Sequence, residues 1–168
     1  TITPSVDKIF AFARLTELAN ISVVILGQDP YYTKDTAQGL AFSSTSITPT
    51  INNIYRCLSQ CGLMKVRPTT GDLTHWAIQG VLLLNCALTT SIGTPRAHMF
   101  IWKRYIDMLI HALSERSSSA SVSSTPIIFM LWGNFAKGKR YLISDKCLIL
   151  EWSHPSPSAT CTKLSFES

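Results

Sequence analysis

Four short apolar segments constrain the fold of this chain more than any other feature. They cover 22–26, 81–84, 127–132 and 148–152, and each consists largely of β-branched, Leu or aromatic residues. Runs of this length are typical of buried strands. Because helical patterns lie between them, right-handed crossovers should make the strands parallel. We therefore predict an α/β fold: a three-layer α/β/α sandwich around a short, mostly parallel four-stranded sheet that is covered on both faces.

Apolar residues at helical spacing recur between these strands. We expect a helix capped by Ser5 that covers the first strand, a helix capped by Thr50, a helix over 72–79, one over about 100–114 and a short basic helix after Asn134. A short strand or extended segment is expected over 39–43. The Ser-rich tract 114–125 has little apolar surface to bury, so it should be a mobile surface loop within one domain, 1–168.

Charge and hydropathy limit the classes of partner that the protein can have. Lys and Arg number 15 against 10 Asp and Glu, which gives a net charge of +5 and a pI of about 9.1. This balance fits a polyanion such as nucleic acid, although many small basic domains bind none. No apolar run reaches the length of a membrane span and no signal-peptide pattern is seen, so we expect a soluble, intracellular protein.

The cysteines do not form a metal-binding pattern. There are five of them, an odd number, and no Cys-x-x-Cys pair. Cys57 and Cys61 are spaced to share one face of a helix, but His and Cys partners at zinc spacing are missing nearby. We expect buried free thiols here, and neither a metal nor another cofactor.

Polar residues follow each of the four predicted strands. They are Asp29, Asn85, Asn134 and His154. The carboxyl ends of parallel strands meet at one edge of a sheet, which is where ligands bind in open α/β folds. Pro30 fixes its own φ and favours an extended Asp29, so this carboxylate should sit in a stiff turn. Singly, an Asp before Pro is more often a turn former; jointly, the strand ends predict a site.

Five short motifs resemble those of the uracil-DNA glycosylase family in order and approximate spacing. They are Gln-Asp-Pro-Tyr at 28–31, Gly-Leu-Ala-Phe-Ser at 39–43, Gly-Val-Leu-Leu-Leu-Asn at 80–85, Leu-Trp-Gly at 131–133 and His-Pro-Ser-Pro at 154–157. The resemblance runs from about 21 to 158. It implies a monofunctional DNA repair enzyme, without a metal, that flips deoxyuridine out of DNA and hydrolyses its N-glycosidic bond.

The resemblance implies catalytic roles for Asp29 and His154. Cleavage of the bond between the sugar and uracil N1 leaves positive charge on the sugar and negative charge on the base, so an anion and a donor are needed. Asp29 would orient the attacking water and stabilise the sugar cation, and a neutral His154 would donate to uracil O2. Related mismatch-type glycosylases typically lack this Asp, which favours the uracil-specific branch.

Four further residues would bind the base and the water. Asn85 would read the N3–H and O4 of uracil, because cytosine presents the opposite donor and acceptor. Tyr31 would fill the space beside C5 of uracil and exclude thymine. Phe42 would stack on the flipped ring. Gln28 would help to hold the water and the loop through its backbone. Without the resemblance, Asn85 would be read as a turn residue and Phe42 as a core residue.

The resemblance also implies contacts to the DNA backbone. They involve Pro30, Thr50, Asn134, Pro155, Ser156, Pro157 and Ser158. Four positions depart from the family pattern. Thr50 and Asn134 stand where the family often has a Ser, Tyr32 replaces a His, and Ser158 replaces a Leu that acts as a wedge in the base stack. Because flipping costs a few kcal/mol, the loss of the wedge predicts a stronger preference for single-stranded or weakly paired uracil, unless Leu164 or another residue of the loop takes the role.

Two other functions stay open at this point. One is a weakly active or inactive family member that serves as a DNA-binding or replication-associated subunit. The other is an unrelated nucleotide-binding α/β enzyme, which the absence of Gly-rich dinucleotide and P-loop motifs disfavours. The expected partners are uracil-containing DNA, single- or double-stranded, and a DNA-mimicking inhibitor protein. We further expect a monomer in the nucleus or cytoplasm, or in the host nucleus if viral, that lacks some terminal helices of its relatives.

Overall fold

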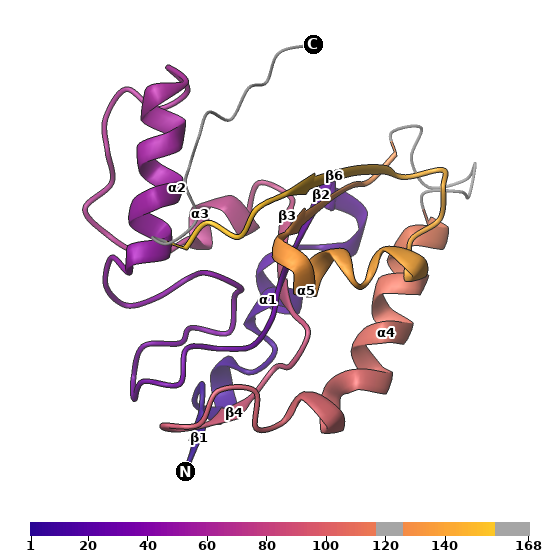
Figure 1. The fold of residues 1–168 in the computed structure, drawn as a ribbon, viewed down its shortest axis with the longest axis horizontal. Coiled ribbons are helices and arrows are strands. Elements are labelled where there is room, and N and C mark those ends of the chain that lie inside the picture. The colour runs from indigo at the N-terminus through magenta and orange to yellow at the C-terminus, as the bar shows by residue number, and fades with distance from the viewer. Residues whose placement is uncertain (117–125, 157–168) are drawn as a thin grey trace.

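A parallel sheet of four strands, in the order β3-β2-β5-β6, forms the centre of the molecule (Figure 1). The computed structural model describes residues 1–116 and 126–156. In chain order the elements are β1 (Ile2–Thr3), α1 (Ala11–Leu15), β2 (Val23–Gly27), α2 (Pro49–Gln60), α3 (Thr74–Ala77), β3 (Val81–Asn85), β4 (Thr90–Ser91), α4 (Met99–Arg116), β5 (Ile128–Trp132), α5 (Gly133–Lys137) and β6 (Leu148–Trp152). The predicted four-stranded parallel sheet with flanking helices is thus confirmed.

The strand register brings the carboxyl ends of the strands to one edge. Gly27 at the end of β2 lies opposite Asn85 at the end of β3. On the other side of β2, Leu26 lies opposite Leu131, and β5 and β6 end together at the pair Trp132 and Trp152. The loops that follow β2, β3, β5 and β6 therefore start at the same edge of the sheet.

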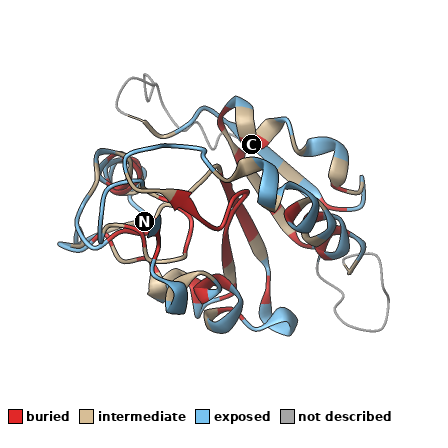
Figure 2. Ribbon diagram, turned by 90° about the horizontal axis from the view of Figure 1, so that it is seen from below, coloured by how far each residue is buried: buried red, intermediate tan, exposed pale blue. Residues whose placement is uncertain are grey.

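On one face of the sheet, the residues of the two central strands are fully buried. Val24, Leu26, Phe129 and Leu131 each have no exposed surface. Burying an aliphatic or aromatic side chain of this size stabilises a fold by about 1.5–3 kcal/mol. Figure 2 shows buried residues along the central strands and also in the helices and loops around them, so the core surrounds the sheet from which the loops begin.

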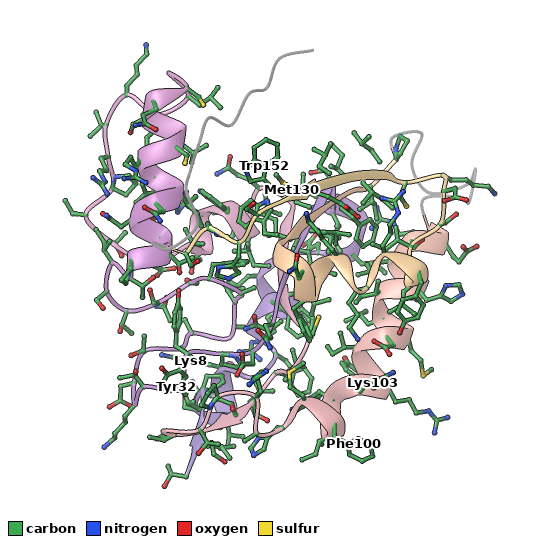
Figure 3. The ribbon with its side chains drawn as sticks, in the orientation of Figure 1. Lys8, Tyr32, Phe100, Lys103, Met130 and Trp152 are labelled. Atoms are coloured by element: carbon green, nitrogen blue, oxygen red, sulfur yellow. The ribbon has the colours of Figure 1, made fainter. Side chains whose placement is uncertain are left out.

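The opposite face of the sheet is covered unevenly. Ile25 and Leu83 in β2 and β3 are almost fully buried, whereas Leu148, Leu150 and Trp152 in β6 are 52%, 39% and 39% exposed. Figure 3 shows Met130 and Trp152 on the side of the sheet above which no other described element passes. Cover on both faces, as predicted, therefore holds for β2 and β3 but not for β6 among the residues that the structure describes.

The first helix is shorter than predicted and starts later. The chain forms a single 3₁₀ turn, Val6–Lys8, and then α1, and the Ser5 side chain makes no capping bond. Val6 is 74% exposed, while Phe12 is buried. The predicted helical face was wrong because the chain turns at Ile9 and rotates a different set of side chains toward the sheet.

Helix α2 is capped two residues earlier than predicted. The Thr48 hydroxyl accepts a bond from the backbone N–H of Ile51, and Pro49 occupies the first turn. Proline suits that position, because its missing N–H has no partner there in any helix. Thr50, the predicted cap, lies inside the helix.

Residues 39–43 form a tight turn rather than the predicted strand or extended segment. An isolated bridge between Ala37 and Ser44 closes the turn. Gly39 and Phe42 have φ values of 79° and 66°, in the left-handed region that bends the chain. Leu40 and Ala41 are buried, so this apolar run reflects packing and not a strand.

Smaller differences concern the other predicted elements. The helix expected over 72–79 is limited to α3, and the short strand β4, for which no strand was predicted, pairs with β1. Helix α4 extends to Arg116, so the first residues of the Ser-rich tract are helical, while 117–125 lie outside the described residues. Cys57 is buried but disulfide-bonded and Cys61 is exposed, so the buried free thiols expected at these two positions are not found there; Cys86 and Cys147 are buried and free. No helix in the described ranges is long and apolar enough to cross a membrane.

Candidate active site

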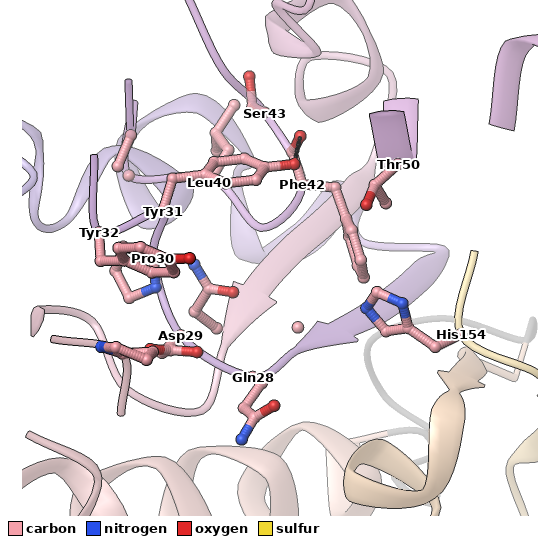
Figure 4. Close-up of a pocket in the computed structure, with 15 residues that line it drawn as sticks. Gln28, Asp29, Pro30, Tyr31, Tyr32, Leu40, Phe42, Ser43, Thr50 and His154 are labelled. Atoms are coloured by element: carbon pink, nitrogen blue, oxygen red, sulfur yellow. Dashed lines mark hydrogen bonds between the residues drawn. The ribbon is translucent and has the colours of Figure 1, made fainter. Parts of the chain in front are cut away.

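A pocket of about 190 Å³ opens at the carboxyl edge of the sheet. Its lining brings together Asp29, Asn85 and His154, which follow or end three different strands. In Figure 4, Asp29 and His154 lie on opposite sides of this space, and the ring of Phe42 reaches into it from a third side. The prediction that these strand-end side chains converge is confirmed for these three.

Asp29 lies in the turn after β2 and is half-buried. Its Oδ2 atom accepts a hydrogen bond from the backbone N–H of Arg96, with an N–O distance of 2.6 Å. Burial raises the pKa of the Asp29 carboxyl, and the Arg96 amide and guanidinium oppose that rise. One carboxylate oxygen is thus held by the protein, which orients the whole carboxylate in the pocket.

Hydroxyl groups hold the loop that carries Arg96. The Thr89 hydroxyl lies 2.9 Å from Nδ1 of His98 and accepts a bond of 2.8 Å from the indole of Trp102. The Thr90 hydroxyl donates to the carbonyl of Thr94 and accepts from the backbone N–H of Ala97. These bonds cross the loop, so they restrain the Arg96 amide that reaches Asp29.

His154 follows the edge strand β6 and keeps more than a third of its surface exposed. Its imidazole nevertheless faces protein on one side, where the Phe42 ring centroid lies 6.0 Å away and is itself 5.4 Å from that of Trp132. This partial desolvation lowers the pKa of His154. The environment therefore favours a neutral imidazole, which can still donate one hydrogen bond.

Asn85 forms the floor of the pocket at the end of β3. It is 7% exposed and lies opposite Gly27 in the parallel pair. An amide offers a donor and an acceptor side by side, so a ligand must present the complementary pair in the same plane. A ligand without it would leave a buried polar group unpaired, which costs about 1–3 kcal/mol.

Tyr31 closes another side of the pocket. Its hydroxyl lies 2.9 Å from that of Thr48 and donates a bond of 3.3 Å to the carbonyl of Phe42. Burial raises the pKa of the Tyr31 phenol, so it stays protonated. These two bonds connect the loop after β2 to the start of α2 and to the turn at Phe42.

Gln28 and Pro30 also line the pocket, but in different ways. The backbone carbonyl of Gln28 accepts a bond of 3.0 Å from the N–H of Ala87, two residues after β3. Its side chain points away from Phe42 in Figure 4. Pro30 is buried in the wall, which stiffens the turn that carries Asp29.

The residues predicted to contact a DNA backbone are less closely grouped. Thr50 lines the pocket, whereas Asn134 is exposed in α5 and is not part of the lining. Pro155 and Ser156 are half-buried beyond His154, and the carbonyl of Pro155 accepts a bond of 3.4 Å from the Asn53 side chain. The predictions for Pro157, Ser158 and Leu164 fall outside the described residues.

The sequence interpretation missed three groups that build this site. The Thr48 cap is announced by the Thr-Pro pair, a known start signal of helices. Asn53 supports the loop after His154 from within α2. The Arg96 contact is made by a backbone amide, for which no sequence signal exists. Within the described ranges, no cluster of three or more His, Cys, Asp or Glu side chains is arranged to hold a metal ion.

Comparison with known proteins gives one consistent result. Residues 14–167 match the model of the uracil DNA glycosylase superfamily. The uracil-DNA glycosylase of Borrelia turicatae is 44% identical over 93% of this chain and 69% of its own length. That of Streptococcus sanguinis is 42% identical over 94% of this chain and 70% of its own length.

Solved structures show the same similarity in three dimensions. The crystal structure of mimivirus uracil-DNA glycosylase has a TM-score of 0.83 and 30% identity, over 93% of this chain and 57% of that one. A variant of the mimivirus protein in complex with UGI matches with a TM-score of 0.84. The structure from Nitratifractor salsuginis, at 21% identity and a TM-score of 0.65, shares the fold. This chain thus spans a little over half of the mimivirus structure and about seven tenths of the curated relatives.

Proposed function

This chain belongs to the uracil DNA glycosylase superfamily, and from that premise we propose that its pocket binds one uracil flipped out of DNA and that Asp29 and His154 cleave the N-glycosidic bond. Uracil excision in DNA repair is the function that its relatives support. The family prediction from the sequence is confirmed. The assignment of each step to a residue is the proposal developed here.

The proposed reaction separates charge between the two sides of the pocket. The bonding electron pair leaves with uracil N1, and the sugar becomes positively charged until water adds to C1′. Asp29 stabilises that positive charge and orients the water, while a neutral His154 donates a hydrogen bond to uracil O2 as the base becomes an anion. Fixed groups of this kind stabilise the transition state without reorganising during the reaction.

Selection of the base is assigned to Asn85, at the floor of the pocket, and to Tyr31, at one wall. Asn85 accepts from uracil N3–H and donates to O4, and cytosine would place a donor against a donor and an acceptor against an acceptor. Tyr31 takes the space beside C5, so the methyl group of thymine would clash with its ring. Phe42 stacks on the flipped base, and Gln28 supports the water and the loop through its backbone.

One observation supports this assignment above all others: Asp29, Asn85 and His154 line the same pocket although they are far apart in the sequence. A carboxylate, an amide and an imidazole are the three chemical groups that the reaction needs. The lowered pKa of His154 agrees with donation by a neutral ring. The raised pKa of Asp29 means that its carboxylate is less well solvated than usual, which strengthens its action on a nearby cation.

The DNA strand on either side of the uracil is proposed to follow Pro30, Thr50, Asn134 and the segment from Pro155. Hydroxyl and amide groups at these positions can donate to phosphate oxygens. Ser158, in place of an apolar wedge, predicts that single-stranded uracil is cleaved faster than uracil in a U·A duplex. Equal or faster cleavage in the duplex would contradict this.

We also propose the partners and the setting of the protein. Uracil-containing DNA, single- or double-stranded, is the substrate, and no cofactor is required. A protein with an acidic, DNA-like surface is a second partner, since the mimivirus relative has been solved with UGI. We propose that residues 1–168 act as one domain and as a monomer inside the cell, in nucleus or cytoplasm, because the DNA substrate lies there.

The decisive test is uracil release from a uracil-containing oligonucleotide, followed as strand cleavage at the abasic site on a gel. Wild-type protein should release uracil from single-stranded DNA, and Asp29→Asn and His154→Leu should each abolish most of the release. Binding of the oligonucleotide without any turnover by wild-type protein would instead support a DNA-binding subunit. Release of thymine or cytosine at the same rate as uracil would contradict the roles of Asn85 and Tyr31.

A further inference from the structure

Two of the side chains proposed to contact the base, Asn85 and His154, each lie against a glycine that ends or directly follows the neighbouring strand. Gly27 ends β2 and lies opposite Asn85, which ends the adjacent strand β3. Gly133 directly follows β5 and lies against His154, which comes shortly after the adjacent strand β6. The same arrangement therefore occurs twice at the edge of the sheet that forms the pocket.

The contact at Gly27 leaves no room for a side chain. A Cβ atom on this residue would overlap Oδ1 of Asn85 and would lie 2.8 Å from Cβ of Ala41. Oδ1 is the far end of the Asn85 side chain, and Asn85 lines the pocket, so the overlap would push its amide into the space that the base is proposed to occupy. Gly27 does not have a left-handed φ. The glycine is thus required by the close approach of Asn85, not by the backbone conformation.

The contact at Gly133 is of the same kind with an additional constraint. A Cβ atom here would lie 2.8 Å from Cβ and 3.5 Å from Cα of His154. These atoms belong to the base of the side chain, so rotation of the imidazole would not relieve the clash and the chain at His154 would have to shift. Gly133 also has a φ of 87°, which other residues adopt only with strain.

We infer that Gly27 and Gly133 are positioning residues for base recognition: the absence of their Cβ atoms lets the Asn85 amide and the His154 imidazole lie against the sheet and sets where the base is held. The inference rests on the proposed function, because it takes Asn85 and His154 as the groups that contact uracil. Neither glycine touches the reacting atoms itself. Each acts through the side chain that it contacts.

Alanine substitutions should therefore affect different steps. Because a misplacement of 1 Å can cost about 100-fold in rate, we expect Gly27→Ala and Gly133→Ala each to lower kcat/KM for uracil release by about 100-fold. Asn85 contacts the base before and during the reaction, so Gly27→Ala should act mainly on KM. His154 meets charge that develops only in the transition state, so Gly133→Ala should act mainly on kcat.

A second background tests whether Gly27 acts through Asn85. In protein that carries both Asn85→Ala and Ala41→Gly, neither close neighbour of the new Cβ atom remains, so adding Gly27→Ala should cause no further loss of residual activity. The same loss in both backgrounds would overturn the inference for Gly27. If Gly27→Ala alone fails to fold, Ala41→Gly added to it removes the second close contact and leaves only the one with Asn85.

The control for Gly133 is Gly62→Ala. Gly62 has a φ of 72°, and a Cβ atom there would meet nothing within 4 Å. Gly62→Ala therefore carries the conformational strain without a displaced neighbour, and it should leave kcat and KM unchanged. If Gly133→Ala lowers the melting temperature as Gly62→Ala does but leaves kcat unchanged, the inference for Gly133 is wrong.

A readout without activity separates this inference from the proposed function. The side-chain NH₂ signals of Asn85, assigned by their absence in Asn85→Ala, should shift in the ¹⁵N–¹H NMR spectrum of Gly27→Ala and stay in place in Gly62→Ala. If wild-type protein releases no uracil, the proposed function fails, yet these spectra still test the contact. An unshifted Asn85 signal in folded Gly27→Ala protein would overturn the inference even if uracil is released.

Discussion

The two edge strands of the sheet, β3 and β6, differ in how far the rest of the molecule covers them. Four of the five residues of β3 are buried, and α1 and α3 pack against this strand. In β6, four of the five residues are exposed, and α5 is the main helix in contact with it. Both strands nevertheless deliver one polar side chain to the pocket: Asn85 from β3 and His154 from beyond β6.

This difference teaches how one pocket combines rigidity with access. In the proposed function Asn85 discriminates between bases, and a buried strand end would hold its amide where a wrong base leaves unpaired groups. In the same proposal His154 contacts the base from the side on which the DNA arrives, and its exposed position would allow that approach. The imidazole is then held by local contacts, namely Phe42 and Gly133, rather than by the main core.

Removal of the Asp29 carboxylate, which follows the central strand β2 next to β3, should have the largest effect. Asp29→Asn keeps the shape and the acceptor for the Arg96 amide but loses the charge, so we expect uracil release to fall by about 10³-fold. Burial raises the pKa of Asp29. At pH values above the ordinary pKa of an Asp, the ionised carboxylate therefore lowers the stability of the fold, and Asn removes this penalty. The melting temperature should stay the same or rise.

The matched control for Asp29→Asn is Asp35→Asn, an exposed carboxylate in the same loop. It should leave uracil release within about two-fold of wild type, because surface changes away from a site have small effects. A comparable loss in both variants would show that the charge of the loop matters and not the position of Asp29.

Leucine truncation in the two edge strands tests the comparison directly. Leu83 in β3 is fully buried, so Leu83→Ala should lower the free energy of unfolding by about 2–5 kcal/mol. Leu150 in β6 is 39% exposed, and Leu150→Ala should cost less than about 1 kcal/mol. Urea denaturation measures both. Equal losses would mean that the exposed face of β6 is covered in solution.

The acid limb of the pH–rate profile should report the surroundings of Asp29. Activity falls as pH drops through the pKa of this carboxyl, which burial raises and the Arg96 charge lowers. Arg96→Gly keeps the amide and suits the φ of 63°, but it removes the charge, so the pKa should rise further and the acid limb should move to higher pH. An exposed charge pair is worth only roughly 0.2–1 kcal/mol, so this upward shift should be small.

Salt and a second arginine serve as controls for this shift. The displacement should shrink at high ionic strength, because exposed charges are screened. Arg104→Gln, on the exposed side of α4, should move the limb less than Arg96→Gly does. A downward shift for Arg96→Gly would show that its guanidinium does not stabilise the Asp29 carboxylate.

The smallest predicted effect concerns the wall at Tyr31. Tyr31→Phe keeps the ring but removes the hydroxyl that contacts Thr48 and the carbonyl of Phe42, and it should lower the free energy of unfolding by about 0.5–1.5 kcal/mol. Tyr105→Phe, on the exposed part of α4, should change it by less. If Tyr31→Phe is neutral, water replaces the hydroxyl and the wall is held by packing alone.

Much of the carboxyl edge of the sheet can be predicted from the local pattern of apolar and polar residues. The four strands, their parallel direction and the polar residues at their ends are visible in the sequence, because burial of a strand imposes an apolar run and its end permits a polar residue. Asp29, Asn85 and His154 were predicted on these grounds and share one pocket. The roles assigned to Pro157 and Ser158 stay predictions, since these residues lie beyond the described part of the chain.

Other features depend on contacts between segments far apart in the chain. Phe42 was placed in a strand and lies in a left-handed turn, because the packing of Leu40 and Ala41 outweighs the extended conformation that the apolar run favours. The bond from the Arg96 amide to Asp29 and the Cβ-free contact at Gly27 are likewise absent from any local pattern.

The apolar pattern of a chain therefore specifies which segments become strands and which residues stand at their ends, because hydrophobic burial acts through side-chain identity. It does not specify which edge of the sheet is covered, or which amide and which missing Cβ atom hold the reactive side chains in place. Those depend on backbone groups, which every residue carries alike, and on how closely distant segments pack once the fold has formed.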